Sequence, residues 1–459
     1  MQENMQAVHH GGFVRNSPFA RIIALVTRDT NVVLVSAILN NLLRAVSSVL
    51  LTRLLMPEAF GIAGIIGSIS FTAAMLSDLG FQAFVVRHED GDVPRFLDTV
   101  WTVSLIRATI LSGLLVALSV PIAALFAKPD LVPMIEWSAL LFIVEGLASL
   151  TLLTAVRQRM ILRLSALELA SMLVQIIASL LLAWWLRNVW AVLIALFFSS
   201  AAKVVLSYAA FPNSRRRFAL DPAYLRDLWG FARYVTGSSM ITLLLMQCDK
   251  LVLARLMSLQ DFGLYILAGN LAAAPMAFAT AYTSRVLYPY YSQLWRDGTG
   301  DLRALFYAKK WLPSLLYSFA AGGLIGSAPL VIDILYDDRY AVTATYLQLL
   351  AITPLVALSS YSANEALVAA GRISTTFRAN IVKLVWLAVA VPSAYFAEGA
   401  VGLVAAVGLM EVPSMLFKWV QLYHMGMLDL RREMLFLGAG LGGFGVGAAG
   451  TMLLAPLLR

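Results

Sequence analysis

The stretch VWAVLIALFFSSAAKVVLSYAAF, which runs from Val189 to Phe211, contains a single charged residue, Lys203. It is long enough to cross the hydrocarbon core of a bilayer as a helix, which takes about 20 apolar residues. A lone strand could not cross, because lipid provides no partner for its backbone N–H and C=O groups. The stretch therefore predicts a transmembrane α-helix.

Apolar blocks of this kind fill the chain. Of its 459 residues, 60% are hydrophobic and 13% are charged, and the mean hydropathy is +0.80. Soluble domains carry about 25% charged residues. The predicted fold class is an all-α polytopic membrane protein with roughly 12–14 transmembrane helices. Thirteen candidate spans lie near residues 32–52, 62–84, 99–123, 131–154, 166–186, 189–210, 232–256, 263–288, 311–335, 345–370, 377–397, 400–423 and 434–457.

Several chemistries find no support in the sequence. Cys248 is the only cysteine, which excludes an internal disulfide, and none of the four histidines is paired at a helical ligand spacing, so no metal site is predicted. No Gly-rich phosphate loop is present, which argues against an ATP-driven pump, and no cofactor is expected. The net charge of +8 is spread over short loops, which argues against nucleic-acid binding.

Basic residues are distributed unevenly between the loops of the two sides. If the N-terminus is cytoplasmic, most of the 34 Lys and Arg residues fall in inner loops or at inner span ends. The positive-inside rule therefore places the N-terminus, with Arg15, Arg21 and Arg28, in the cytoplasm. The outer loops hold only Arg53, Lys128, Arg187, Arg255, Arg339 and Arg459.

A short motif occurs twice. RLLMPEAFG, Arg53–Gly61, follows the first predicted span, and RLMSLQDFG, Arg255–Gly263, follows the seventh. Arg, Leu, Phe and Gly match in register, although chance similarity between two membrane turns is an alternative. If the repeat is real, each unit has six helices, and both units run in the same direction through the membrane.

These motifs resemble the polysaccharide transporter, or Wzx-like oligosaccharide flippase, family of the multidrug/oligosaccharidyl-lipid/polysaccharide exporter superfamily. The resemblance rests on LTRLLMPEAFG (Leu51–Gly61), SDLGF (Ser77–Phe81), DKLVLARL (Asp249–Leu256), FGLY (Phe262–Tyr265) and LYP (Leu287–Pro289). It implies MATE-like lobes of six helices each and a location in the bacterial inner membrane. It also implies flipping of undecaprenyl-pyrophosphate-linked repeat units by alternating access, with a glycan polymerase and export machinery as possible partners. The family usually has twelve or fourteen spans, against the thirteen expected here.

The expected organisation has five parts. A cytoplasmic N-terminal segment covers residues 1–30, and an N-lobe of six helices covers 31–211. A cytoplasmic linker follows over 212–231, before a six-helix C-lobe over 232–424. An additional helix occupies 425–459.

Charge at bilayer depth is costly, so an ionisable side chain within a span is a functional candidate. The basic side chains within the spans are therefore candidates for binding an anionic substrate. Asn40, Arg44 and Ser48 lie one turn apart on one helix face near mid-span and are expected to line a cavity. A buried pair that locks two helices is the alternative. Three further candidates are Arg107, Lys203 and Lys250. Their charged end groups could instead reach the membrane–water interface.

Acidic side chains within the spans are candidates for coupling transport to H⁺ or Na⁺. This set comprises Glu145, Glu365, Glu411 and Asp249. The alternative role is an intramembrane ion pair with a basic residue, and Glu411 shares a helix face with Lys418. Asp249 and Lys250 are sequence neighbours that point about 100° apart, so they are not expected to pair. Asp78 is expected to shape a turn.

Other functions compete with the flippase. A multidrug cation antiporter of the same superfamily would need an acidic, aromatic-lined cavity. A membrane-embedded glycan transferase or polymerase would need a catalytic cluster in a sizeable outer loop, for which Asp333, Asp337 and Asp338 are the only faint candidates. A third alternative is a non-transporting partner in glycan assembly.

Overall fold

In the computed structural model, which describes residues 29–458 except 159, 212–213 and 298–300, the chain is helical and the described part contains no strand. The predicted segment 1–30 lies almost wholly outside the described residues. The elements in chain order are α2 (Asp29–Leu54), α3 (Pro57–Leu76), α4 (Phe81–Arg87), α5 (Pro94–Ala117), α6 (Ser119–Leu125), η1 (Pro129–Leu131), α7 (Val132–Gly146), α8 (Thr151–Arg157), α9 (Ile161–Leu186), α10 (Trp190–Ala209), α11 (Pro222–Leu256), α12 (Leu259–Ala272), α13 (Ala274–Tyr282), η2 (Thr283–Leu287), α14 (Tyr288–Asp297), α15 (Leu302–Ala308), α16 (Trp311–Leu335), η3 (Asp338–Tyr340), α17 (Val342–Leu350), α18 (Ile352–Ala369), α19 (Ile373–Gly408), α20 (Glu411–His424) and α21 (Leu430–Leu458).

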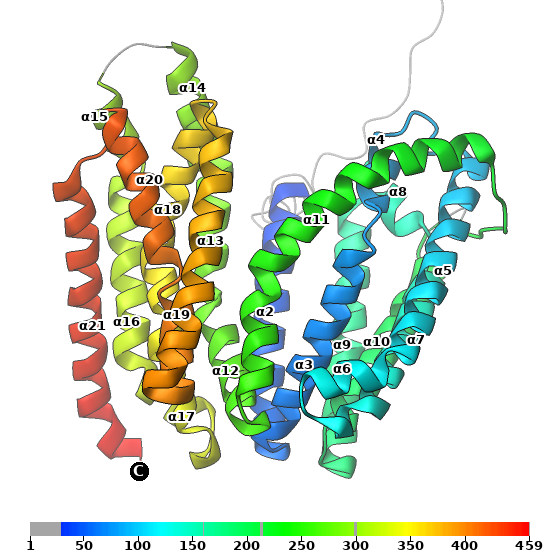
Figure 1. Ribbon diagram of the computed structural model, residues 1–459, viewed down its shortest axis with the longest axis horizontal. Helices are drawn as coiled ribbons and strands as arrows, with labels where there is room; N and C mark the ends of the chain where they lie inside the picture. The colour runs from blue at the N-terminus through cyan, green and yellow to red at the C-terminus, as the bar shows by residue number, and fades with distance from the viewer. Residues whose placement is uncertain (1–28, 159, 212–213, 298–300, 459) are drawn as a thin grey trace, which may run out of the picture.

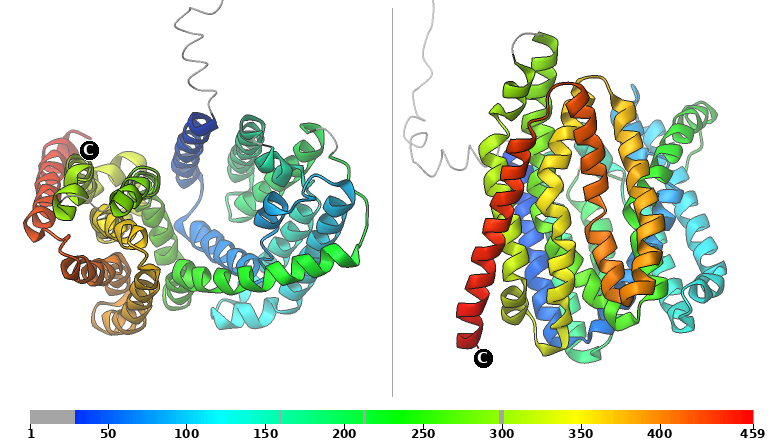
Figure 2. Two further views of the ribbon diagram at one scale, coloured as in Figure 1. Left: turned by 90° about the horizontal axis from the view of Figure 1, so that it is seen from above. Right: turned by 60° about the vertical axis from the view of Figure 1, so that its left-hand side comes forward.

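The helices gather into two groups. Figure 1 shows α3–α10 on one side and α12–α21 on the other, with α2 and α11 between them. The end of the molecule that carries α4, α8, α14 and α15 is called the upper face here, and the end that carries α6 and α17 is called the lower face. Seen from above in Figure 2, α2 stands between the two groups. This arrangement is consistent with two lobes.

Each of the thirteen predicted spans overlaps a helix or a run of consecutive helical segments. By length and composition, nine helices of the described part could cross a membrane, or ten if the bent pair Pro129–Gly146 and Thr151–Arg157 is one span. The predicted spans in α2 and α11 are not among these nine. The all-α membrane fold is confirmed, while the count of thirteen crossings stays a prediction.

One of the nine stretches, Ile373–His424, contains two of the predicted spans. Its 52 residues would reach about 78 Å as one helix, far more than the roughly 30 Å of a bilayer core. Gly399 interrupts the helical geometry with φ 60° and ψ −135°. The Nε1–H group of Trp386 then donates to the Ala406 carbonyl at 2.8 Å, so the segments before and after Gly399 run antiparallel. Glycine suits this reversal, since a left-handed φ strains other residues.

Helix α11 begins inside the predicted linker 212–231. Asp221 accepts a hydrogen bond from the Ala223 N–H group at 3.0 Å, and Pro222 occupies the first turn, where its missing N–H group costs nothing. The helix has 35 residues, more than a crossing requires. Its first part runs along the upper face before the helix turns down between the two groups (Figure 1).

The two copies of the repeated motif pack against each other at the lower face. A Cβ atom placed on Gly61 would lie 2.0 Å from the Leu259 carbonyl oxygen, and one placed on Gly263 would lie 2.0 Å from the Pro57 carbonyl oxygen. These contacts are reciprocal, because Leu259 holds the same motif position as Pro57. Helices α3 and α12 therefore approach backbone to backbone, which only glycine permits here.

Replacing Gly61 by alanine is expected to destabilise the protein. Its methyl group would overlap the Leu259 carbonyl, and overpacking of this kind costs about 1–3 kcal/mol. Gly67→Ala in the same helix is the matched control, since its added Cβ would meet nothing within 4 Å and alanine favours helix by about 1 kcal/mol. The thermal unfolding midpoint in detergent should fall for Gly61→Ala and hold or rise for Gly67→Ala; equal effects would contradict the close contact.

Candidate substrate and ion sites

The polar stripe of α2 lies on the helix that stands between the two groups. Arg44 is exposed, and Asn40 and Ser48 are half-buried. Among the described residues, Arg44 has no ion-pair partner. Helix α2 packs on α9. Whether the stripe lines a cavity stays a prediction, but this guanidinium has no described carboxylate to neutralise it.

Arg107 of α5 lies in a partly apolar setting. Its guanidinium carbon is 5.7 Å from the centre of the Phe81 ring, and its Nε atom has no hydrogen-bond partner in the described part. Asp78 and Glu145 are close enough to interact with it electrostatically. Two predicted candidates from different sets, Arg107 and Glu145, are thus neighbours.

Asp78 shapes a turn, as the sequence predicted. One carboxylate oxygen accepts the Gly80 N–H group at 2.9 Å, and the other accepts the Ser239 hydroxyl at 2.9 Å. Gly80 adopts a left-handed φ of 69° between α3 and α4. The carboxylate therefore joins the α3–α4 break to α11.

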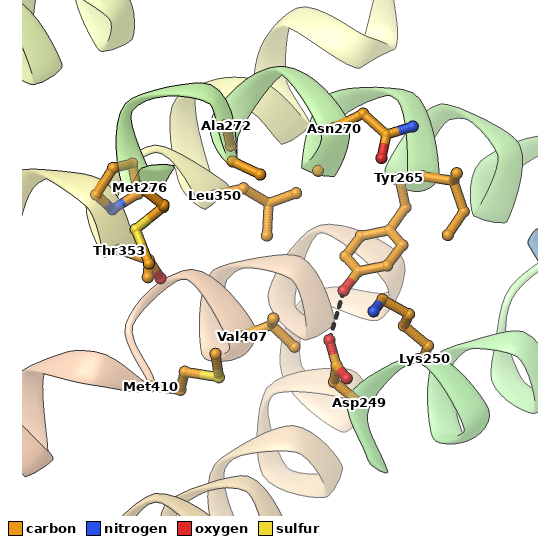
Figure 3. A pocket seen from close by; sticks show the side chains of 14 residues that line it. Asp249, Lys250, Tyr265, Asn270, Ala272, Met276, Leu350, Thr353, Val407 and Met410 are labelled. Carbon is orange, nitrogen blue, oxygen red and sulfur yellow. Dashed lines mark hydrogen bonds between the residues drawn. The ribbon is translucent and has the colours of Figure 1, made fainter. Parts of the chain in front are cut away.

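A pocket of about 270 Å³ lies between α11, α12, α18 and α19. Figure 3 shows Asp249, Lys250, Tyr265 and Asn270 around it, with Thr353 on the far wall. The Tyr265 hydroxyl donates to Asp249 at 2.8 Å, and the Lys250 ammonium donates to the Met246 carbonyl at 3.2 Å. Asp249 and Lys250 form no ion pair within 4.0 Å, as their angular separation predicted. The pocket thus contains a carboxylate without a described cationic partner.

Glu411 lies in a different environment, fully buried between two lysines. Its carboxylate is 2.5 Å from Lys383 Nζ and 3.4 Å from Lys418 Nζ. The Ser360 hydroxyl donates to it at 2.5 Å and accepts from Lys418 at 2.8 Å. Glu365, half-buried, also interacts with Lys418. The shared face of Glu411 and Lys418 was predicted, whereas the location of Lys383 and Lys418 in a buried cluster was not.

A second buried ion pair escaped the sequence reasoning. Lys310 Nζ lies 2.5 Å from the carboxylate of Glu433, and both side chains are inaccessible. The hydroxyls of Tyr307 and Ser359 donate to the same carboxylate. The available signal was Glu433 itself, an acid in the first turn of an apolar helix. Without the partner helix, it was indistinguishable from a residue at the membrane surface.

The remaining candidate stands apart from these groups. Lys203 of α10 is exposed and has no ion pair among the described residues. The candidates therefore occupy separate places: the α2 stripe, the Arg107–Glu145 neighbourhood, the Asp249 pocket and the Glu411 cluster. In the described part, no group of three or more His, Cys, Asp or Glu residues could hold a metal ion.

A family of polysaccharide biosynthesis proteins matches residues 50–345, well over half of the chain. The chain belongs to this family. It is a multi-pass membrane protein, and the resemblance drawn from the repeated motif is confirmed.

Relatives of known designation are distant in sequence. The succinoglycan biosynthesis transport protein ExoT of Rhizobium meliloti is 23% identical over 68% of this chain and 62% of its own length. The lipopolysaccharide biosynthesis protein WzxC of Escherichia coli is 22% identical over 80% of this chain and 74% of its own length. The teichuronic acid biosynthesis protein TuaB of Bacillus subtilis is 20% identical over 66% of this chain, which spans 63% of TuaB.

Two solved structures share the fold. The lipid II flippase MurJ in an inward closed conformation superposes with a TM-score of 0.65 at 12% identity, covering 93% of this chain and 99% of MurJ. An inward-facing multidrug resistance MATE family transporter superposes with a TM-score of 0.59 at 12% identity, covering 86% of this chain and 95% of its own. These likenesses support the MATE-like fold class.

Replacing Lys310 by methionine is expected to cost about 3–5 kcal/mol of stability, because Glu433 would remain buried without a counter-charge. Lys309→Met is the matched control, since the neighbouring Lys309 is exposed. The double change Lys310→Met with Glu433→Leu should recover most of the loss, as apolar replacements of buried pairs do. Thermal unfolding in detergent tests this; similar midpoints for the two single lysine variants would refute it.

Proposed function

We propose that this protein is a flippase that moves polyprenyl-pyrophosphate-linked oligosaccharide units across the bacterial inner membrane, for exopolysaccharide, capsule or lipopolysaccharide assembly. Family membership and the names of ExoT and WzxC support the substrate class. The MurJ fold supports a transporter rather than a transferase or polymerase. The observation that carries the proposal is Arg44, an exposed cation that forms no ion pair with any described residue and lies on the helix between the two groups.

Arg44 is suited to a pyrophosphate ligand. An arginine that faced hydrocarbon would be strongly disfavoured, so an exposed guanidinium in mid-span needs water or an anion beside it. A guanidinium binds phosphate oxygens through two parallel N–H bonds, and low polarity strengthens that attraction. Asn40 on the same face adds an uncharged hydrogen-bonding group for sugar hydroxyls, whereas the Ser48 hydroxyl is already hydrogen-bonded to Tyr336.

In the proposed mechanism, the two groups of helices move relative to each other. We propose an N-lobe over 31–211, a C-lobe over 232–424, the linker 212–231 and an additional helix over 425–459. The upper face is cytoplasmic by the positive-inside rule, as is the N-terminal segment. The lobes rock relative to each other, and the polyprenyl tail stays in lipid between them. A glycan polymerase on the far side would receive the substrate.

Of the four acidic candidates, Asp249 is best placed to couple transport to H⁺ or Na⁺. Glu411 is compensated by two lysines, and Glu145 lies near Arg107. Asp249 instead faces a pocket, and among the described residues the uncharged Tyr265 hydroxyl is its one side-chain hydrogen-bond partner. A carboxylate in that position can accept a proton or a monovalent cation. Lys250 lines the same pocket. Its positive charge can balance Asp249 when the carboxylate holds neither a proton nor a cation.

The central test is transbilayer movement of a fluorescent polyprenyl-pyrophosphate oligosaccharide in proteoliposomes. Arg44→Ala should weaken substrate affinity roughly 10- to 100-fold, since a hydrogen bond to a charged group contributes about 1.5–3 kcal/mol. Arg44→Lys should retain part of the activity, and Arg53→Ala near the end of the same helix should be close to wild type. Absence of movement by the wild-type protein, or full activity of Arg44→Ala, would refute the proposal.

The coupling assignment is tested by imposing a pH or Na⁺ gradient on the same proteoliposomes. Asp249→Asn should abolish stimulation by the gradient while leaving slow, gradient-independent exchange. Tyr265→Phe removes the hydrogen bond but keeps the carboxylate, so its stimulation should persist. Gradient stimulation that survives in Asp249→Asn would assign coupling to another residue.

A further inference from the structure

At the lower face, Lys128 crosses from the first half of the chain to the second. It lies between α6 and η1, and its ammonium donates to the Ala254 carbonyl at 2.7 Å and to the Met257 carbonyl at 3.3 Å. Ala254 is in the last turn of α11, where carbonyls have no partner within the helix. A cation at a helix C-terminus also opposes the negative end of the helix dipole.

Arg339 and Tyr340 make the opposite crossing, from the second half to the first. They belong to η3, the turn before α17. A guanidinium nitrogen of Arg339 donates to the Thr52 carbonyl at 3.2 Å, and the Tyr340 hydroxyl donates to the Leu55 carbonyl at 2.8 Å. Thr52 lies in the last turn of α2 and Leu55 directly follows it, so these groups satisfy orphan carbonyls of α2.

The two crossings are equivalent under the internal repeat. In the register that aligns Gly61 with Gly263, Thr52 corresponds to Ala254 and Leu55 corresponds to Met257. The donors come from equivalent places as well, because η1 precedes α7 as η3 precedes α17. Each half therefore reaches across to bind the same two carbonyls at the end of the other half's opening helix.

From this symmetry we infer that Lys128 and the Arg339–Tyr340 pair are two matched latches that hold the lower face closed and must both release before it opens. The inference rests on the rocking motion proposed above. If the lobes separate at this face, each donor loses its acceptors on the opposite half together. The acceptors are backbone carbonyls, so closure does not depend on which side chains occupy the four acceptor positions, 52, 55, 254 and 257.

The charge around the latches fits this role. Asp337 binds the Arg339 guanidinium with its carboxylate, and these hydrogen bonds hold the pKa of Asp337 below its usual range. The guanidinium is therefore oriented toward α2 by a residue of its own half. Lys128 has no described carboxylate partner; burial, and then the charge of Arg255, lower its pKa. Its carbonyl acceptors thus provide its main compensation.

The latches can be tested by measuring distances between spin labels in the full-length protein in nanodiscs, without substrate. After Cys248→Ser, labels are attached to cysteines replacing Leu125 in α6 and Val342 in α17, both exposed near the latches. The unmodified latches should give one short-distance population. Lys128→Met with Arg339→Met removes the ammonium and guanidinium donors, keeps much of their volume and leaves only the Tyr340 hydroxyl across the face. This variant should add a longer-distance population larger than the sum of the single-variant effects.

The control is the pair Arg53→Met with Arg255→Met. These arginines occupy matching motif positions near the same face and make no described hydrogen bond to the opposite half, so their distances should stay short. Should the double latch variant fail to fold, Tyr340→Phe removes one bond only and should produce a smaller long-distance population. Unchanged distances in the latch variants, or equal opening in the control, would overturn the inference. Because no transport is measured, either result stands apart from the liposome test of function.

Discussion

The fold depends on the contact of two glycines, Gly61 and Gly263, at the junction between the two halves of the chain. Each backbone comes so near the other that a single methyl group would overlap a carbonyl oxygen. Membrane helices gain little from burying apolar side chains, because lipid is equally apolar. Close backbone packing is therefore a main source of adhesion between the halves, and only small residues permit it.

The same constraint explains how the helices are broken. Inside a bilayer every backbone polar group needs a partner within the protein. At the break between α19 and α20, the Thr353 hydroxyl donates to the Gly408 carbonyl at 2.8 Å. At the break after α3, Asp78 fills the equivalent need. Polar side chains on neighbouring helices thus allow the chain to bend without leaving unpaired carbonyls or N–H groups.

Charge is treated differently in the two halves. The second half contains buried clusters in which Glu411 and Glu433 are matched by lysines, an arrangement that fixes helix positions and gives no free charge to a ligand. Helix α2, the opening helix of the first half, instead presents Arg44, which forms no ion pair with any described residue. The proposed transport of an anion fits that division, since a compensated charge holds the scaffold together while an uncompensated one is available to a ligand.

The sequence alone determined the membrane class, the approximate spans and the repeated motif, because span length and composition are local properties that lipid enforces on each helix separately. It also predicted the shared face of Glu411 and Lys418, which the structure confirms, and it nominated Arg44 and Asp249, whose roles stay predictions. Only the tertiary structure decided that the motif glycines contact each other, that Lys310 pairs with Glu433, and that Lys128 and Arg339 reach equivalent carbonyls. Those facts depend on which distant helices become neighbours, and no local pattern of residues encodes that choice.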